Sequence, residues 1–181
     1  MSCENIVLIG FMGSGKSSVG RLIASSLGYR FVDTDHLVIQ ATGAEISEIF
    51  KNHGESYFRD QERIALQSLQ QSDRLVIATG GGIVTREENI ALLRKLGFVV
   101  WLTASEEVIF DRVSRNTKRP LLQTANPRET ISHLLAQRKP QYEAAAQFVF
   151  DTSEFPHAGI AESIIAAAAS HFTAVSNCRS S

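Results

Sequence analysis

Short apolar runs alternate with longer segments of helical periodicity along this chain of 181 residues. The runs are rich in valine, isoleucine, leucine and phenylalanine, and most do not alternate between apolar and polar positions. This pattern is typical of strands in a parallel sheet that is covered on both faces. The predicted strands are residues 6–9, 30–33, 75–78, 98–102 and 148–150.

Between these runs, apolar residues recur at the spacing of amphipathic helices. The predicted helices are residues 16–27, 45–71, 87–96, 106–115, 128–145 and 159–171, and the second is expected to break near Gly54. Strands that alternate with helices predict an α/β fold built on a doubly wound sheet. Ligands bind such sheets outside the carboxyl ends of the strands, so we expect the functional site there.

The composition is typical of one soluble globular domain. Hydrophobic residues make up 44% of the chain and charged residues 20%, which is enough apolar material for a sizeable core. Residues 1–175 are therefore expected to form a single domain. The small polar residues 176–181 are expected to be a disordered tail.

Charge and cysteine content narrow the class of partner. The formal net charge is -1, which gives no indication of nucleic acid or anionic membrane as a partner. Cys3 and Cys178 lie near opposite ends without metal-ligand spacing, which favours a reducing compartment. The chain begins without a leader pattern, and no uninterrupted apolar stretch reaches the ~18 residues of a membrane span. We expect a cytoplasmic monomer that binds neither nucleic acid nor membrane.

The most specific motif is GFMGSGKS at residues 10–17, which fits the phosphate-loop pattern G-x-x-x-x-G-K-[ST]. It lies between a predicted strand and a predicted helix, where backbone N–H groups and the helix dipole favour an anion. Lys16 adds a charge for the outer phosphates, and the Ser17 hydroxyl is placed to bind Mg²⁺. The alternative is a glycine-rich turn, which does not require lysine and serine at these positions.

Two carboxylates follow the second predicted strand. Asp33 and Asp35 are two positions apart, so in an extended chain both would face the rim while Thr34 points away. One could hold Mg²⁺, and the other could accept a proton from a substrate hydroxyl. The alternative is an Asx turn or a helix cap for residues 36–41.

Three glycines, Gly80, Gly81 and Gly82, follow the third predicted strand. They allow positive φ and a close approach of backbone to ligand, and their N–H groups could bind an anionic substrate. The alternative is a flexible turn into the next helix.

Arginines offer a planar fork for carboxylates and phosphates. Arg59 and Arg138 are candidates for a carboxylate, and Arg119 lies in a basic, loop-like stretch that is a candidate lid. The alternative for each is a solvated surface charge. The five histidines show no metal spacing and are interpreted as structural or surface residues, and Trp101 is assigned no role.

Taken together and in this order, the motifs resemble those of the shikimate kinase family across residues 5–165. They are the phosphate loop, Asp33-Thr34-Asp35, Phe58-Arg59-x-x-Glu62, Gly80-Gly81-Gly82, Arg119-Pro120-Leu121-Leu122 and Arg138-x-x-x-Tyr142. The resemblance implies a P-loop kinase fold with a five-stranded parallel sheet of order 2-3-1-4-5, a substrate-binding insertion at about 34–62 and a lid at about 114–126. It implies transfer of the γ-phosphate of ATP to the 3-hydroxyl of shikimate, a step of aromatic amino acid biosynthesis.

The resemblance also implies residue roles. The nucleotide phosphates would be held by Gly13, Ser14, Gly15, Lys16, Ser17 and Ser18. Ser17 and Asp33 would hold Mg²⁺. Arg119 would reach the ATP phosphates, and adenine would lie between Arg112 and Pro156. The substrate would be bound by Asp35, Arg59, Gly80, Gly81, Gly82 and Arg138, with Asp35 at the reacting hydroxyl. Lys16, Asp35 and Arg119 would be the catalytic residues.

Two alternatives remain open. Another small-molecule kinase of this fold, such as a gluconate or nucleoside-monophosphate kinase, would share the phosphate loop, but the aspartate pair, the glycine triplet and the two arginines argue against it. A GTPase switch would need a guanine-binding Asn-Lys-x-Asp segment, which the sequence lacks. A relative without turnover would be expected to have lost Lys16, Asp35 or Arg119.

Overall fold

The computed structural model describes residues 4–114 and 126–179 of the chain. Its strands form one parallel sheet of order β2-β3-β1-β4-β5, so the predicted order is confirmed. The strands are β1 (Ile6–Ile9), β2 (Arg30–Asp33), β3 (Leu75–Ala78), β4 (Phe98–Thr103) and β5 (Phe148–Asp151). The helices are α1 (Lys16–Leu27), α2 (Thr34–Thr42), α3 (Ile46–Ser68), the 3₁₀ turn η1 (Ile83–Thr85), α4 (Glu87–Leu96), α5 (Glu106–Ser114), α6 (Pro127–Ala145) and α7 (His157–Arg179).

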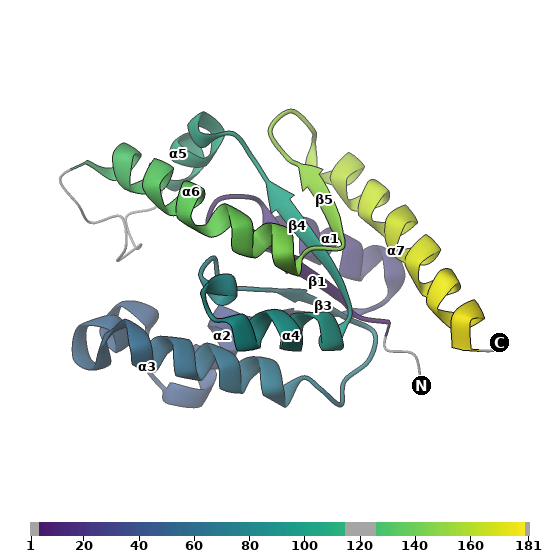
Figure 1. The fold of residues 1–181 in the computed structure, drawn as a ribbon, viewed down its shortest axis with the longest axis horizontal. Helices are drawn as coiled ribbons and strands as arrows, with labels where there is room; N and C mark the ends of the chain where they lie inside the picture. Colours follow the sequence, from purple (N-terminus) through teal and green to yellow (C-terminus); the bar gives the residue numbers. More distant parts are fainter. Residues whose placement is uncertain (1–3, 115–125, 180–181) are drawn as a thin grey trace.

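The central strand β1 is buried on both faces. Ile6 and Leu8 pack into one apolar cluster with residues of α1 and α7, while Val7 and Ile9 pack into another with residues of α3, α4 and α6. Alternate side chains of a strand point to opposite faces, so a strand covered on both sides is apolar throughout. The helices therefore form a layer on each side of the sheet (Figure 1).

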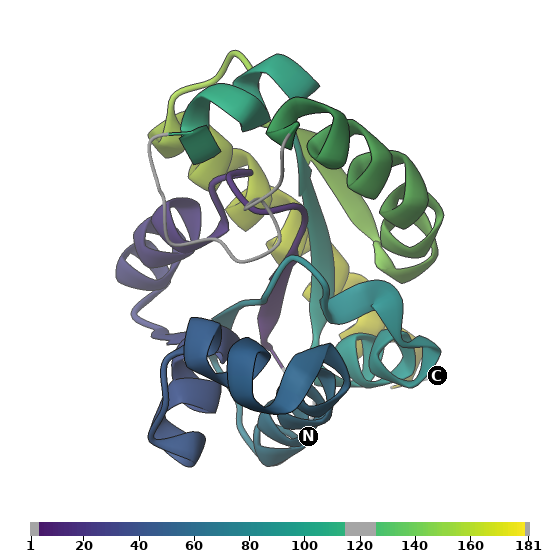
Figure 2. The same cartoon turned by 90° about the vertical axis from the view of Figure 1, so that its left-hand side faces the viewer.

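The carboxyl ends of the strands form one rim of the molecule. Figure 2 looks onto this rim, with α3 on one side and α5 and α6 on the other. The predicted break in the second long helix is confirmed, because Gly54 has φ 79° and ψ 177° inside α3. Together α2 and the part of α3 up to Glu62 occupy the segment predicted to be the substrate-binding insertion.

The C-terminal helix differs from the prediction. α7 begins at His157 and continues to Arg179, so residues 176–179 are helical and not a disordered tail. The alanine-rich segment before them favours the helix, and the Ser176 hydroxyl donates to the Phe172 carbonyl at 2.9 Å. By length and composition alone, α7 could cross a membrane. Of the apolar window that spans His157–Cys178, 22% is buried, and its buried residues Ile160 and Ile164 pack in the core beside α1.

Candidate active site

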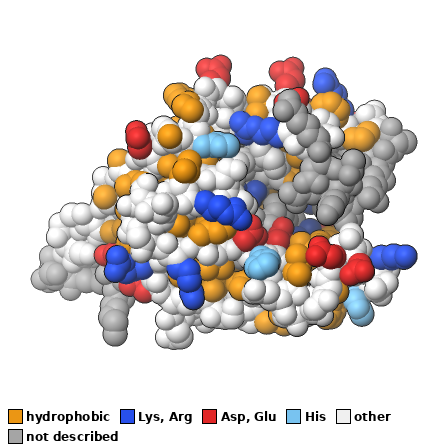
Figure 3. Space-filling model, turned by 180° about the vertical axis from the view of Figure 1, so that it is seen from behind, with side chains coloured by type: hydrophobic (Ala, Val, Ile, Leu, Met, Phe, Trp, Pro, Cys, Tyr) orange, Lys and Arg blue, Asp and Glu red, His pale blue; other side chains and the backbone are white. Residues whose placement is uncertain are grey.

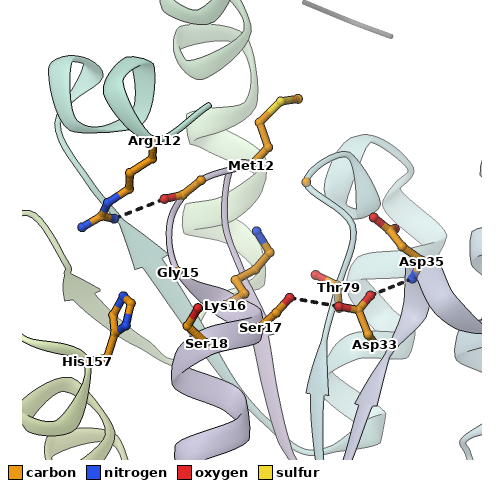
Figure 4. A pocket seen from close by; sticks show the side chains of 12 residues that line it. Met12, Gly15, Lys16, Ser17, Ser18, Asp33, Asp35, Thr79, Arg112 and His157 are labelled. Carbon is orange, nitrogen blue, oxygen red and sulfur yellow. Dashed lines mark hydrogen bonds between the residues drawn. The ribbon is translucent and has the colours of Figure 1, made fainter. Parts of the chain in front are cut away.

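A cavity of about 430 Å³ opens at the carboxyl ends of β1, β2 and β3. Its lining is polar at the loop and the strand ends, and residues from four helices contribute to it (Figure 4). The lining residues are Met12, Gly13, Gly15, Lys16, Ser17, Ser18, Asp33, Asp35, Thr79, Gly81, Arg112 and His157. Seen from behind, the molecular surface is hollowed beside basic and acidic side chains (Figure 3).

The phosphate loop joins β1 to α1 on the floor of this cavity. Gly13 and Gly15 have φ values of 81° and 92°, which residues other than glycine rarely adopt. The Lys16 ammonium donates to the carbonyls of Gly10 and Phe11, each at 2.8 Å. The lysine therefore lies folded against its own loop, at the N-terminus of α1, where an anion is electrostatically favoured.

Ser17 and Asp33 meet beside the loop. The Ser17 hydroxyl donates to the Asp33 carboxylate at 2.9 Å, and the other carboxylate oxygen accepts from the Asp35 backbone N–H at 3.1 Å. Asp33 is thus the N-cap of α2 and also faces the cavity. The helix cap that the sequence offered as one interpretation is therefore confirmed, and the role of Asp33 as a metal ligand stays a prediction.

The predicted extended arrangement of the aspartate pair is wrong, because α2 begins at Thr34. Asp35 lies in the first turn of this helix, and its side chain still lines the cavity together with Asp33. Thr34 points away, as predicted. It is fully buried, and its hydroxyl accepts from the Gly80 backbone N–H at 3.1 Å.

The Ser17–Asp33 pair suits a magnesium ion. A hydroxyl and a carboxylate offer the oxygen ligands that Mg²⁺ prefers. Within residues 4–114 and 126–179, no group of three or more His, Cys, Asp or Glu side chains could hold a metal. Phosphate oxygens and water would have to complete the coordination, as is usual for Mg²⁺ in phosphoryl-transfer sites.

Arg59 is held at the bend of α3 by two carboxylates. It donates to Glu62 at 2.6 Å and to Glu55 at 2.7 Å. Its side chain and that of Glu62 are 6% and 0% exposed, whereas the Glu55 side chain is 51% exposed. Burial raises the pKa of Glu62 to about 7, Arg59 opposes this shift, and the Asp35 carboxylate adds to it. Burial would lower the pKa of Arg59, but Glu62 and Glu55 outweigh burial and raise it.

The glycine triplet is required by close packing. A Cβ on Gly80 would collide with carboxylate oxygens of Glu62 and Asp35, and a Cβ on Gly82 would collide with the Arg59 guanidinium. None of the three glycines has positive φ, so that part of the prediction is wrong. The triplet brings the aspartate of α2 and the arginine of α3 against one stretch of backbone.

The other candidate arginine approaches this backbone from α6. Arg138 donates to the Gly81 carbonyl at 3.3 Å, and the Tyr142 hydroxyl donates to the same oxygen at 2.5 Å. Tyr142 is in turn stacked on Trp101, with ring centroids 5.5 Å apart. Burial lowers the pKa of Arg138, which is 4% exposed. A motif arginine that could have been a solvated surface charge is therefore a buried cation beside Gly81.

On the opposite side of the loop, Arg112 is fixed by three hydrogen bonds. It donates to the Gly13 carbonyl at 3.2 Å and to the hydroxyl and carbonyl oxygens of Thr152 at 3.1 and 2.9 Å. Pro156 is exposed just before α7 and does not line the cavity. Arg119 lies outside the described residues.

Three residues of this region carried no predicted role. Glu62 and Tyr142 both stand in the quoted motifs, each one helical turn after the motif arginine. A polar side chain at this spacing lies beside the arginine on a helix, and this spacing could have identified both residues. His157 was interpreted as structural or on the surface, yet it lines the cavity. No motif in the sequence marks it.

Comparisons with known proteins agree with this geometry. The shikimate kinase family model (SKI) matches residues 12–169 of the chain. A shikimate kinase of Thermodesulfovibrio yellowstonii is 52% identical over 162 residues, which cover 90% of this chain and 93% of that protein. The structure of shikimate kinase from Acinetobacter baumannii in complex with shikimate has a TM-score of 0.89 and 38% identity, covering 93% of this chain and 94% of that one.

A gluconokinase from Sinorhizobium meliloti 1021 has 21% identity and a TM-score of 0.55 over 94% of both chains, so the likeness is one of fold alone. The motifs at the rim, the arginines packed against the glycine triplet and the family match agree with one another. The chain belongs to the shikimate kinase family.

Proposed function

We propose that the protein transfers the γ-phosphate of ATP to the 3-hydroxyl of shikimate, giving shikimate 3-phosphate and ADP. The observation that carries this proposal is a juxtaposition. Asp35 lines the phosphate-loop cavity, and Gly80 packs against both Asp35 and Glu62, the buried partner of Arg59. A phosphate site and a cationic clamp for a carboxylate therefore share one wall.

The nucleotide side uses the phosphate loop. Backbone N–H groups of residues 13–18 and the N-terminus of α1 would hold the phosphates, and Lys16 would leave the carbonyls of Gly10 and Phe11 to neutralise the transferred group. Ser17 and Asp33 would hold Mg²⁺, which when bound neutralises charge on the phosphates. Arg112 and Pro156 would flank the adenine.

The acceptor side uses the cluster around the glycine triplet. Arg59 and Arg138 would grip the shikimate carboxylate, and the Gly80–Gly82 backbone would fix the ring. Glu55 is the exposed partner of Arg59, so the substrate carboxylate can take its place while the buried Glu62 keeps the guanidinium in position. The Arg59 guanidinium is therefore held in position by Glu62 before the substrate binds.

Asp35 would orient the 3-hydroxyl and accept its proton as the oxygen attacks the γ-phosphorus and the bond to ADP breaks. Phosphoryl transfer depends mainly on positioning and charge stabilisation, which Lys16 would supply on the phosphate side. Arg119, in the proposed lid at about 114–126, would add charge and exclude water.

We further propose that the protein works as a cytoplasmic monomer in a single domain, without nucleic acid or membrane. The apolar residues of α7 that enter the core support this proposal, as does the net charge of -1.

Release of ADP from ATP and Mg²⁺ tests the function. The purified protein would be offered shikimate, gluconate, a nucleoside monophosphate or no acceptor. Release that requires shikimate supports the proposal, and release with gluconate alone would favour the alternative kinase. Asp35→Asn should lower kcat with shikimate by at least about 100-fold while ADP binding persists.

A further inference from the structure

The two arginines proposed to grip the substrate carboxylate are held in different ways. Arg59 is paired with two carboxylates, whereas Arg138 forms no ion pair with any residue that the structure describes. The Arg138 Nη1 donates to the Gly81 carbonyl at 3.3 Å, which is long for such a bond, and its buried Nε has no hydrogen-bond partner among the described residues. Arg138 is therefore a buried cation that is bonded weakly to a neutral oxygen.

Tyr142 donates to the same carbonyl oxygen. It lies one helical turn after Arg138 on α6, and its hydroxyl is 2.5 Å from the Gly81 oxygen. Its ring is 1% exposed and stacked on Trp101, so the hydroxyl has little freedom to turn elsewhere. Burial raises the pKa of Tyr142, which keeps the phenol protonated as a donor at neutral pH. The tyrosine is thus the fixed partner of Gly81, and the arginine is the weaker one.

A substrate carboxylate would compete with the Gly81 carbonyl for Arg138. Charge favours the carboxylate, because a charge-assisted hydrogen bond is stronger than one to a neutral oxygen. With Tyr142 in place, the carbonyl keeps a donor when the arginine turns away. Without the tyrosine hydroxyl, Arg138 would be the one side chain of the described residues that donates to this oxygen, and its departure would leave a part-buried carbonyl unpaired.

We propose that Tyr142 is a positioning residue for the acceptor substrate, which holds the Gly81 carbonyl and so frees Arg138 for the substrate carboxylate. The inference rests on the proposed function, which places that carboxylate at Arg138. Tyr142 acts through the arginine and makes no contact with the reacting atoms. Trp101 contributes as well, because its indole fixes the tyrosine ring.

Calorimetric titration with shikimate tests the inference. Tyr142→Phe removes the hydroxyl and keeps the ring against Trp101. Because one hydrogen bond no longer supports the exchange, Kd for shikimate should rise about 3- to 10-fold, while Kd for MgADP stays unchanged. Tyr29→Phe is the matched control. It removes a tyrosine hydroxyl that donates to Glu4 at 3.1 Å, just before β2 and therefore at the opposite rim of the sheet. This variant should match the wild type.

Two further comparisons separate positioning from a general structural effect. In an Arg138→Met background, Tyr142→Phe should change kcat/KM for shikimate by less than about 2-fold, because the group through which the tyrosine acts is gone. A shikimate analogue with a hydroxymethyl group in place of the carboxylate gives the second comparison. Wild type and Tyr142→Phe should have equal kcat/KM for this analogue. The ratio of kcat/KM for the two substrates does not depend on the folded fraction, so the test holds for a less stable variant.

Unchanged shikimate affinity in Tyr142→Phe would overturn the inference. An equal loss in the Arg138→Met background, or with the hydroxymethyl analogue, would also overturn it and would show that the tyrosine supports the rim in general. Wild-type protein that turns over no shikimate would instead contradict the proposed function.

Discussion

Arg59 and Glu62 lie one turn apart on α3 and form an ion pair of 2.6 Å that is almost completely buried. Buried charges are costly unless they are paired and hydrogen-bonded, and here the arginine has a second, exposed partner in Glu55. The side of the guanidinium away from Glu62 is therefore held by a half-exposed carboxylate, whose place a substrate carboxylate can take. The clamp proposed for the substrate carboxylate depends on this arrangement.

Removing the Arg59 cation should weaken the binding of shikimate and leave the binding of ATP unchanged. Arg59→Ala is expected to raise KM for shikimate roughly 10- to 100-fold, because a charge-assisted hydrogen bond to the carboxylate is lost. KM for ATP should not change. Lys51→Ala, an exposed cation on the same helix, serves as the control. An equal rise in both KM values would mean that Arg59 has a structural role instead.

Glu55 is expected to compete with the substrate for Arg59. Glu55→Gln removes the exposed carboxylate and leaves Glu62 in place, so shikimate should bind about 2- to 5-fold more tightly. Shikimate titrations of the wild type and the variant measure this difference. Weaker binding by the variant would show that Glu55 orients Arg59 for the substrate rather than competing with it.

The raised pKa of Glu62, about 7 against an ordinary 4.5, links stability to pH. The folded protein holds this proton more tightly than the unfolded chain. The contribution of Glu62 to stability is therefore complete below about pH 4.5 and is lost as pH rises through 7. Glu62→Gln has no such proton. The thermal midpoint of the wild type minus that of the variant should fall between about pH 5 and 7.5. A constant difference, or one that grows with pH, would contradict the assignment.

The glycine triplet can be tested by adding one methyl group. Gly80→Ala places a Cβ against the carboxylates of Asp35 and Glu62, and overpacking of this kind costs about 1–3 kcal/mol. We expect a lower thermal midpoint and loss of turnover. Gly159→Ala is the matched control, because a Cβ there meets no atom within 4 Å and the position is helical. If Gly80→Ala behaves like Gly159→Ala, the close approach is not required.

Much of the fold could be predicted because the strands are apolar on both faces. The ends of β1, β2 and β3 match their apolar runs, whereas β4 and β5 each extend one residue further, to Thr103 and Asp151. Those two polar residues are partners in the last register pair of β4 and β5. These strand ends are set by pairing between strands that are remote in sequence. The hydrophobic pattern of a single segment contains no information about that pairing.

The site could be predicted where motifs identify it and not where packing creates it. The phosphate loop and Asp33 stand in patterns whose chemistry is local. The place of Asp35 depends on where α2 begins, and the contact of Gly82 with Arg59 depends on how α3 lies against the sheet. His157 reaches the cavity only because α7 packs on α1. None of these three relationships can be inferred from spacing alone.

The identity of the phosphorylated product tests the central claim most directly. Phosphorus and proton NMR of a reaction containing the protein, ATP, Mg²⁺ and shikimate would follow the fate of the γ-phosphate. The account predicts one phosphate ester on the 3-hydroxyl of shikimate for each ADP formed. Inorganic phosphate without an ester, or a phosphate on another hydroxyl, would contradict the placement of the acceptor between Asp35 and the two arginines.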